Sequence, residues 1–253
     1  MMTKDRLILE SAFHDHQASQ RAGTFLERPD RLRFRDDDYL DHETWIRPAF
    51  ERLGDLRNVR ALDFGCGHGM AGVVLARRGA RVTGLDLSYG YLSEARERSL
   101  ANNTNIQLLQ ANGEALPFAD QSFDRIWGNA ILHHLDIGKA GKEIFRILGL
   151  GGVAVFAEPW GENPLLRWAR RRALYPGKER TRDEEPLRQK HVHILRDIFP
   201  RVEVQGFQLF AMAGRVLSYS HRLTALDSWD QMLLTRVPRL QQYCRYVVLT
   251  LRK

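Results

Sequence analysis

The sequence has few cysteines and no long apolar run, and each of these shortages excludes a class of protein. It contains two cysteines, Cys66 and Cys244, which are too few for the disulfide framework of a small secreted domain. No apolar stretch approaches the roughly 18 to 20 residues of a transmembrane helix. The N-terminus, Met-Met-Thr-Lys-Asp, has no apolar signal core. We therefore expect free thiols, no membrane span and a cytoplasmic location.

Lysine is scarce as well, although the chain is strongly basic. Six of its 38 Lys and Arg residues are Lys, and the formal net charge at pH 7 is +7. Such a charge can attract nucleic acid, an anionic lipid surface or an acidic substrate. Acidic residues are interleaved with the arginines nearly everywhere, which favours charges spread over a solvated surface. With 253 residues, 43% of them hydrophobic, we expect one large α/β domain.

A group of glycines follows the first predicted strand. Residues 61–64, Ala-Leu-Asp-Phe, are typical of a short buried strand, and an apolar helical pattern begins at Met70. Between them lie three glycines at alternate positions, Gly65, Gly67 and Gly69. A glycine loop between a strand and a helix can cradle a nucleotide, because glycine admits close backbone approach and the first helical turn offers unpaired N–H groups.

The spacing of this loop and two nearby acids narrow the choice of nucleotide. A dinucleotide-binding loop reads G-x-G-x-x-G/A. Here Met70 stands where the last small residue would be, and Gly69 comes one residue early. Asp63 lies just before the loop, and Asp86 ends the next apolar run, about 20 residues after Gly65. A carboxylate at that place can hold ribose hydroxyls from the tip of the neighbouring strand.

Further blocks of sequence follow the glycine loop along the chain. They are Gly-Leu-Asp-Leu-Ser at residues 84–88, Ala-Asn-Gly-Glu-Ala-Leu-Pro-Phe at 111–118, Ser-Phe-Asp at 122–124, Leu-His-His-Leu at 132–135 and Ile-Leu-Gly-Leu-Gly-Gly at 147–152. Together with the loop at residues 62–69 they resemble the class I S-adenosylmethionine-dependent methyltransferases, in particular the small-molecule, methyltransferase-11-like branch. A tight turn that needs glycine could explain any one block, but it does not explain the series.

The resemblance implies a Rossmann-like, doubly wound α/β fold. Its seven-stranded sheet would be mostly parallel with an antiparallel last strand, and N-terminal and inserted helices would cap it. We expect residues 1–57 to form a helical lid and residues 58–253 the methyltransferase domain, with cap insertions at about 160–186 and 211–240. These insertions would cap the pocket or form a homodimer surface. Residues 163–172 predict a basic amphipathic helix over the active site, and contact with an anionic membrane or an acidic substrate stays open.

The resemblance also implies which residues hold the cofactor. The chain would bind S-adenosylmethionine, release S-adenosylhomocysteine and use no metal. Asp63 would position the methionine end through the loop and water, Asp86 would bind the ribose, and Asn129 would lie near the sulfonium. Asn112 stands where many relatives carry Asp, and its side-chain oxygen can accept the same bond from the adenine amino group. The predicted set is Asp63, Gly65, Cys66, Gly67, Gly69, Asp86, Leu87, Asn112, Gly113, Glu114 and Asn129.

Three side chains are candidates for catalysis, namely His133, His134 and Glu158. Open α/β sheets bind ligands outside the carboxyl ends of their strands, where the fourth and fifth predicted strands deliver these residues. A histidine, with an ordinary pKa of about 6.5, can act as a general base. For His134 we favour a role in bracing the loop, because the family uses Leu-x-His across different chemistries, and His133 is then free to face the acceptor. Glu158 is a second candidate, either for binding the methyl acceptor or for acting as a general base.

Residues near the N-terminus are candidates to line a lid over the cofactor, although ordinary helix packing explains each of them equally well. A helix-like pattern begins at Asp37. His14 and His16 suggest a metal, but no third ligand has motif spacing, so we predict a polar loop there and no metal site. The lid candidates are Phe13, His14, His16, Phe25, Tyr39 and Trp45.

Three functions stay open. The favoured one is methyl transfer to a small-molecule acceptor, on oxygen or carbon. An RNA methyltransferase would use the basic charge, but the Asn/Asp-Pro-Pro-Tyr tetrapeptide of amino-directed nucleic-acid enzymes is missing after the fourth predicted strand, where the sequence reads Gly-Asn-Ala-Ile. We therefore do not expect nucleic acid as a partner. The third is a protein that binds S-adenosylmethionine without methyl transfer, since fold does not fix function. The acceptor, its reacting atom and the use of a base remain undetermined.

Overall fold

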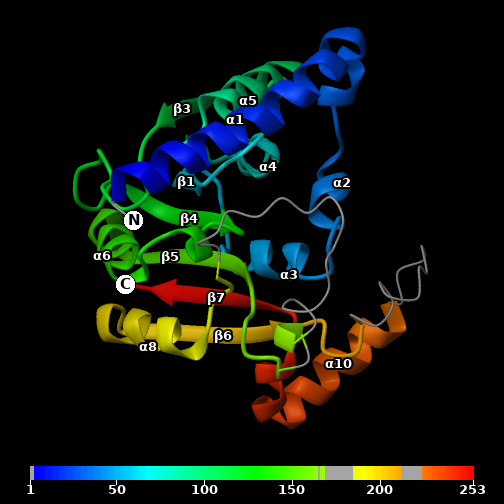
Figure 1. The fold of residues 1–253 in the computed structure, drawn as a ribbon, viewed down its shortest axis with the longest axis vertical. Helices are drawn as coiled ribbons and strands as arrows, with labels where there is room; N and C mark the ends of the chain where they lie inside the picture. The colour runs from blue at the N-terminus through cyan, green and yellow to red at the C-terminus, as the bar shows by residue number, and fades with distance from the viewer. Residues whose placement is uncertain (1–2, 165, 169–184, 212–223) are drawn as a thin grey trace.

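The computed structural model describes residues 3–164, 166–168, 185–211 and 224–253, and there the chain forms a central sheet with helices on both faces (Figure 1). The described part holds seven strands: β1 Arg60–Phe64, β2 Arg81–Asp86, β3 Ile106–Gln110, β4 Phe123–Asn129, β5 Leu148–Pro159, β6 Arg201–Phe207 and β7 Tyr246–Arg252. Their order is β3-β2-β1-β4-β5-β7-β6. The first five strands in this order pair in parallel, and β7 pairs antiparallel with β5 and β6. The predicted fold class is confirmed.

Helices connect the parallel strands, and two of them, α5 (Tyr89–Ala101) and α6 (Ile137–Ile147), begin at side-chain caps. Helix α4 (Met70–Arg77) follows the glycine loop, and α5 and α6 follow β2 and β4. Ser88 caps α5, because its side chain accepts a hydrogen bond from the backbone of the first turn. Since β1 lies between β2 and β4, the winding reverses there, and the carboxyl ends of these strands open a crevice for a ligand.

Two apolar cores lie on opposite faces of the sheet because successive strand residues point to opposite sides. On β4, Ile126 belongs to the core that includes Ile144 of α6. Its neighbour Trp127 belongs to the other core, with Leu75 of α4 and Phe50. All five side chains are fully or almost fully buried. The sheet is therefore covered on both faces, and its open crevice lies at the carboxyl ends of the central strands.

The N-terminal region begins with the long helix α1 (Thr3–Glu27), which lies alongside α5 in Figure 1. The polar loop predicted around His14 and His16 is wrong, since both residues lie in the middle of this helix. The polar residue between them, Asp15, accepts hydrogen bonds from Ser88 and from the backbone of Gly90 at the start of α5.

The single helix predicted from Asp37 onward is two short ones. After the 3₁₀ turn η1 (Pro29–Leu32) come α2 (Asp36–Leu40) and α3 (Ile46–Glu51). Arg47 bridges the turn between them through ion pairs with Asp37 and Asp41. The break lets apolar residues of both helices join the core with Leu75 and Trp127.

The predicted cap insertions are described in part. Helix α8 (Gln189–Ile198) follows the first insertion and leads into β6. The second contains α10 (Thr224–Arg236) and the 3₁₀ helix η3 (Pro238–Tyr243). Half of the predicted basic helix 163–172, namely residues 165 and 169–172, and all of residues 212–223 lie outside the described residues. None of the helices in the described ranges is long and apolar enough to cross a membrane.

Candidate functional site

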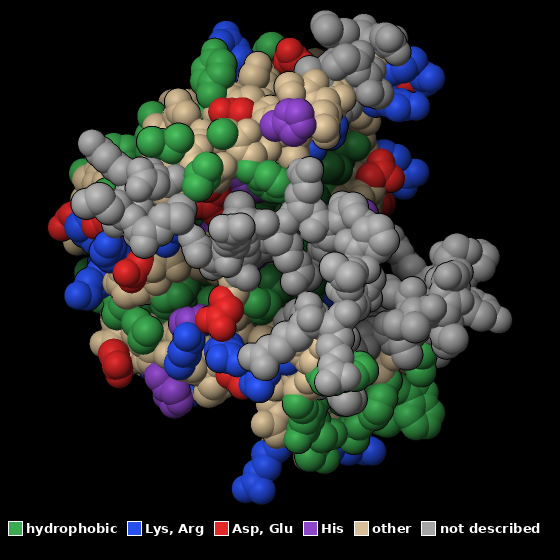
Figure 2. Space-filling view, in the orientation of Figure 1, with side chains coloured by type: hydrophobic (Ala, Val, Ile, Leu, Met, Phe, Trp, Pro, Cys, Tyr) green, Lys and Arg blue, Asp and Glu red, His purple; other side chains and the backbone are tan. Residues whose placement is uncertain are grey.

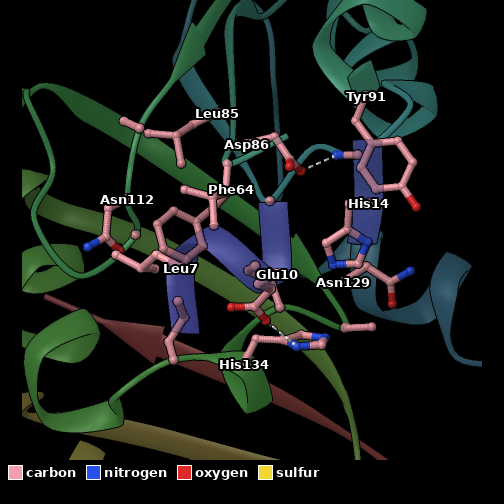
Figure 3. Close-up of a pocket in the computed structure, with 18 of the residues that line it drawn as sticks. Leu7, Glu10, His14, Phe64, Leu85, Asp86, Tyr91, Asn112, Asn129 and His134 are labelled. Atoms are coloured by element: carbon pink, nitrogen blue, oxygen red, sulfur yellow. Dashed lines mark hydrogen bonds and ion pairs between the residues drawn. The ribbon is translucent and has the colours of Figure 1, made fainter. Parts of the chain in front are cut away.

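A cavity of about 260 Å³ lies at the carboxyl ends of β1, β2 and β4 (Figure 3). Its walls come from the loops after the first four strands and from one face of α1. The lining residues are Leu7, Glu10, His14, Phe64, Gly65, Gly67, His68, Leu85, Asp86, Leu87, Tyr91, Ala111, Asn112, Gly113, Asn129, Ala130, Ile131, His134 and Leu135. Eight of the predicted site residues therefore meet here: Gly65, Gly67, Asp86, Leu87, Asn112, Gly113, Asn129 and His134.

The glycine loop needs its glycines for backbone conformation and for space. Gly65, Gly67 and Gly69 have φ angles of 69°, 48° and 81°, in the left-handed region that favours glycine. A Cβ on Gly65 would lie 2.6 to 2.9 Å from side-chain atoms of Ile131, and one on Gly69 would lie 2.7 Å from the Cβ of Ala95. Gly65 and Gly69 are therefore tightly packed, whereas a Cβ on Gly67 would meet nothing within 4 Å.

Asp86 connects the end of β2 to this loop. Its Oδ2 accepts a hydrogen bond from the amide of Gly67 at 2.8 Å, and its Oδ1 accepts one from the amide of Ser88 at 2.9 Å. Burial raises the pKa of the carboxyl, and these two hydrogen bonds oppose that rise. Each oxygen keeps acceptor capacity after one bond, so the carboxylate can still receive hydroxyl groups from a ligand in the cavity.

Asp63, Cys66 and Gly69 lie behind the cavity rather than in its lining. Asp63 is buried at the end of β1 next to Gly72 of α4, and burial raises the pKa of its carboxyl to about 7. Burial likewise raises the pKa of the Cys66 thiol well above its usual value. These side chains support the loop from inside the fold, and a buried thiol of this kind is not a ready nucleophile.

The turn after β3 contributes Asn112 and Gly113. The Oδ1 of Asn112 accepts a hydrogen bond from the amide of Glu114 at 2.9 Å, so the predicted adenine acceptor also holds its own turn. Glu114 is buried and does not line the cavity. Its carboxylate pairs with Arg6 of α1 and accepts a hydrogen bond from the amide of Asp136 at 2.9 Å.

The loop after β4 separates the three catalytic candidates. His134 lines the cavity, and its Nδ1 lies 2.7 Å from Oε1 of Glu10 on α1. His133 lies outside the lining, with its Nδ1 2.8 Å from Oε2 of Glu158. Glu158 is fully buried, and its Oε1 accepts hydrogen bonds from the amides of Ile131 and Leu132. The loop-bracing contacts expected of His134 are thus made by His133 and Glu158.

Three polar atoms at the cavity are buried and have no hydrogen-bond partner among the described residues: Oδ1 of Asn129, Nδ1 of His68 and Nδ1 of His14. Burial lowers the pKa of His68 to about 4, so its ring is neutral at neutral pH. Buried polar groups are normally paired. A ligand with several hydrogen-bonding groups would fit these atoms.

The lid candidates divide between cavity, surface and core. His14 lines the cavity and packs against the ring of Phe13. His16 is exposed and pairs with Gln20. Tyr39 accepts a hydrogen bond from Trp127, and Trp45 stacks on Tyr246, so both belong to the core. The side chain of Phe25 lies outside the described residues.

Sequence reasoning missed ten residues of the lining, which are Leu7, Glu10, Phe64, His68, Leu85, Tyr91, Ala111, Ala130, Ile131 and Leu135. Leu7, Glu10 and His14 follow the i, i+3, i+7 spacing of one helical face, which was the available signal. No group of three or more His, Cys, Asp or Glu side chains that could hold a metal ion was found among the described residues.

Comparisons with known proteins agree with this geometry. Residues 62–156 match a protein-family model described as a methyltransferase domain. The chain is 39% identical over 106 residues to malonyl-[acyl-carrier protein] O-methyltransferase of Enterobacter lignolyticus, covering 42% of this chain and 41% of the relative. It is 37% identical over 121 residues to 2-phytyl-1,4-naphtoquinone methyltransferase of Thermosynechococcus vestitus, covering 46% and 53%. The chain thus matches about half the length of these curated relatives.

The fold itself recurs in a solved structure. A crystal structure of an S-adenosylmethionine-dependent methyltransferase from Mesorhizobium loti superposes with a TM-score of 0.56. The match covers 85% of this chain and 100% of that chain at 19% sequence identity. At this identity the likeness supports the fold alone.

Proposed function

We propose, on the premise that residues 62–156 match a methyltransferase domain, that the chain transfers a methyl group from S-adenosylmethionine to a small-molecule acceptor. The supporting observation is the convergence of loops from four successive strands on one cavity. These loops carry the glycine cradle, the acid at the end of β2, the Asn-Gly turn after β3 and Asn129 after β4.

Each of the predicted cofactor residues has a proposed task. Gly65 and Gly67 admit the cofactor, and Asp86 receives the ribose hydroxyls. Asn112 and Gly113 hold the adenine. The remaining predicted cofactor residues act by shape or position: Asp63, Cys66 and Gly69 support the loop, Leu87 lines the ribose side, Glu114 fixes the adenine turn and Asn129 faces the sulfonium.

S-adenosylmethionine supplies a methyl group that is already electrophilic, so the chain's main task is to align an acceptor with it. Among the catalytic candidates, His134 is best placed to take a proton, because it lines the cavity and is oriented by Glu10. For His133 and Glu158 we propose a positioning role, since their contacts fix the loop that carries His134.

The acceptor class follows from the relatives' names and the cavity. One named relative is an O-methyltransferase of a malonyl carrier protein, and another is a methyltransferase of a naphthoquinone. We therefore propose an oxygen or carbon atom of a small molecule as the acceptor. The wild-type chain should release S-adenosylhomocysteine with at least one member of a panel of malonyl thioesters, phenols and quinones.

The same panel tests the alternatives. Transfer to RNA that weakens steeply with salt would support the nucleic-acid function instead. Tight binding of S-adenosylhomocysteine without turnover on any acceptor would support a protein that binds the cofactor without transferring methyl. A wild-type chain that fails to bind S-adenosylhomocysteine in calorimetric titration would contradict the proposed function as a whole.

For the domain organisation we propose a lid in residues 1–57, methyltransferase residues 58–253, and caps at about 160–186 and 211–240. The contribution of α1 to the cavity lining supports the lid. Helices α2 and α3 pack into the core and would anchor it. Deletion of residues 1–27 should leave a folded chain that binds S-adenosylhomocysteine weakly, whereas unchanged binding would contradict the lid.

We also propose a homodimer through the cap helices. Figure 2 shows hydrophobic side chains gathered at the lower right, where α10 lies in Figure 1. Large apolar side chains there are exposed, among them Trp229 at 66%, Phe210 at 57% and Met232 at 43%. Such a cluster often marks an interaction surface. Sedimentation should give a dimer that Trp229→Glu dissociates, and a monomeric wild type would exclude it.

The proposed location is the cytoplasm. Cys66 and Cys244 are both free and buried, which fits a reducing compartment. Fractionation of cells that express the chain should place it with cytoplasmic markers, and recovery with secreted proteins would contradict this.

A further inference from the structure

Helix α1 presents one stripe of side chains to the cavity. Leu7, Glu10 and His14 lie on the same helical face and all three belong to the lining (Figure 3). The wall they form lies opposite the loops that carry the methyltransferase sequence blocks. A ligand that fills the cavity must therefore contact α1 as well as those loops.

Polar contacts hold this stripe in place on both sides of His14. On the N-terminal side, Oε1 of Glu10 lies 2.7 Å from Nδ1 of His134. On the C-terminal side, Oδ1 of Asp15 accepts hydrogen bonds from Ser88 at 2.6 Å and from the amide of Gly90 at 2.9 Å. The backbone that carries His14 is thus fixed before any ligand arrives, which lowers the ordering cost of a contact from its ring.

The ring of His14 is positioned but not satisfied. It packs against Phe13 and Tyr91, with ring centroids 5.2 and 5.3 Å away. Its Nδ1 is buried and has no hydrogen-bond partner among the described residues. The neighbouring side chains of Glu10 and Asp15 are both paired. An unpaired polar atom in this setting normally has a partner that comes from a ligand or a water molecule.

We infer that His14 binds the cofactor directly and adds a contact from α1 to those of the glycine loop. The inference rests on the proposed function, since the ligand is S-adenosylmethionine. Figure 3 places His14 on the side of Asp86 and Tyr91, away from Asn112 at the adenine turn. An imidazole nitrogen can pair with an oxygen atom, and on this side the cofactor offers its ribose hydroxyls and its amino-acid carboxylate.

Calorimetric titration with S-adenosylhomocysteine tests the contact. His14→Leu removes the ring nitrogens and should raise Kd by about tenfold, the value of one hydrogen bond without a substitute. His14→Asn places an amide near the position of Nδ1 and should retain most of the affinity. The matched control is His16→Leu on the same helix, since His16 is exposed and outside the cavity, and its Kd should equal that of the wild type.

The melting temperature of the ligand-free protein distinguishes a purely structural role of His14 from a contact with the cofactor. His14→Leu should leave this temperature unchanged or raise it, because it removes an unpaired buried nitrogen, while the increase caused by S-adenosylhomocysteine becomes smaller. Equal loss of stability with and without ligand would overturn the inference. So would wild-type affinity in His14→Leu.

A second ligand locates the contact. Adenosine has the ribose but lacks the homocysteine end. Weaker binding of both ligands by His14→Leu assigns the contact to the ribose, and weaker binding of S-adenosylhomocysteine alone assigns it to the amino-acid end; either result supports the inference. If the wild type binds and the variant binds equally well, this inference fails alone. If the wild type does not bind, the proposed function fails too.

Discussion

The carboxylate of Asp86 accepts a hydrogen bond from the amide of Gly67, with 2.8 Å between Oδ2 and N. The tip of β2 thereby fixes the loop at the end of β1. One side chain is committed to two tasks, since the same carboxylate lines the cavity where a ribose would lie.

Asp86→Ala removes both tasks at once. We expect the Kd for S-adenosylhomocysteine in calorimetric titration to rise more than about tenfold, because hydrogen bonds to a carboxylate are stronger than neutral ones. Asp86→Asn keeps an acceptor for Gly67 and should lose less. Asp120→Ala, at an exposed ion pair, is the charge control and should bind like the wild type. Equal affinity of Asp86→Ala and wild type would contradict the ribose assignment.

Gly65→Ala and Gly151→Ala separate backbone strain from lost space. Both glycines have positive φ, 69° and 71°, so alanine costs about 1 to 2 kcal/mol of conformational strain at either place. A Cβ on Gly151 meets nothing within 4 Å, whereas one on Gly65 meets Ile131. Urea unfolding should therefore show a larger loss of stability for Gly65→Ala, and this variant alone should lose cofactor binding. Similar losses of stability in both variants would show that crowding against Ile131 does not contribute.

Stability should depend on pH through Asp63. Burial raises the pKa of its carboxyl to about 7 from its ordinary value of 3.8. Between these values the folded chain keeps a proton that the unfolded chain has released, so Asp63 lowers the free energy of unfolding as the pH rises. In Asp63→Asn this dependence is absent. The difference in unfolding free energy, variant minus wild type, should rise by up to about 1.4 kcal/mol per pH unit between about pH 5 and 7 and then level off.

Urea unfolding of both proteins at each pH measures this difference and cancels groups common to the two. His68 is one such group, because its pKa of about 4 gives stability that is lost as the pH falls below about 6.5. A difference that stays flat from pH 5 to 8 would show that Asp63 is not protonated in the folded chain.

Glu158→Ala should destabilise the chain by about 3 kcal/mol in urea unfolding. The change leaves the amides of Ile131 and Leu132 and the ring of His133 without their buried acceptor. Glu158→Gln keeps one oxygen for the two amides and should cost less. If Glu158 instead acted only on the methyl-accepting substrate, both variants would lose turnover while keeping wild-type stability.

Much of the cofactor side could be predicted because its signals are local. The conformation of Gly65 and the position of Asp86 at the end of a strand depend on a few neighbouring residues, so the spacing of the motif carries them. The seven-stranded, mostly parallel sheet follows from the resemblance that the sequence blocks carry, whereas its strand order depends on pairing between distant segments. The structure extends β5 back to Leu148, which pairs with Phe123 of β4 ahead of a register shift, and regular pairing with β4 and β7 begins at Val153.

What could not be predicted depends on contacts between distant parts of the chain. Glu10 becomes a cavity residue only because α1 docks beside α5 and meets His134, more than 100 residues away in sequence. The roles of neighbours His133 and His134 are decided by which ring turns toward Glu158, and the pattern Leu-x-His does not contain that choice. The polar residues around His14 and His16 predict a loop, but both histidines lie in α1, where Asp15 between them accepts hydrogen bonds from the distant start of α5.

The antiparallel strand β7 has a consequence for how the chain folds. It lies between β5 and β6, although about 40 residues separate β6 from it in sequence. During synthesis β6 has no strand beside it until β7 has been made. The part of the sheet formed by β7 and β6 must therefore assemble late and through non-local pairing. Until then the edge of β5 is open, and a chaperone that covers an unpaired strand would find its target there.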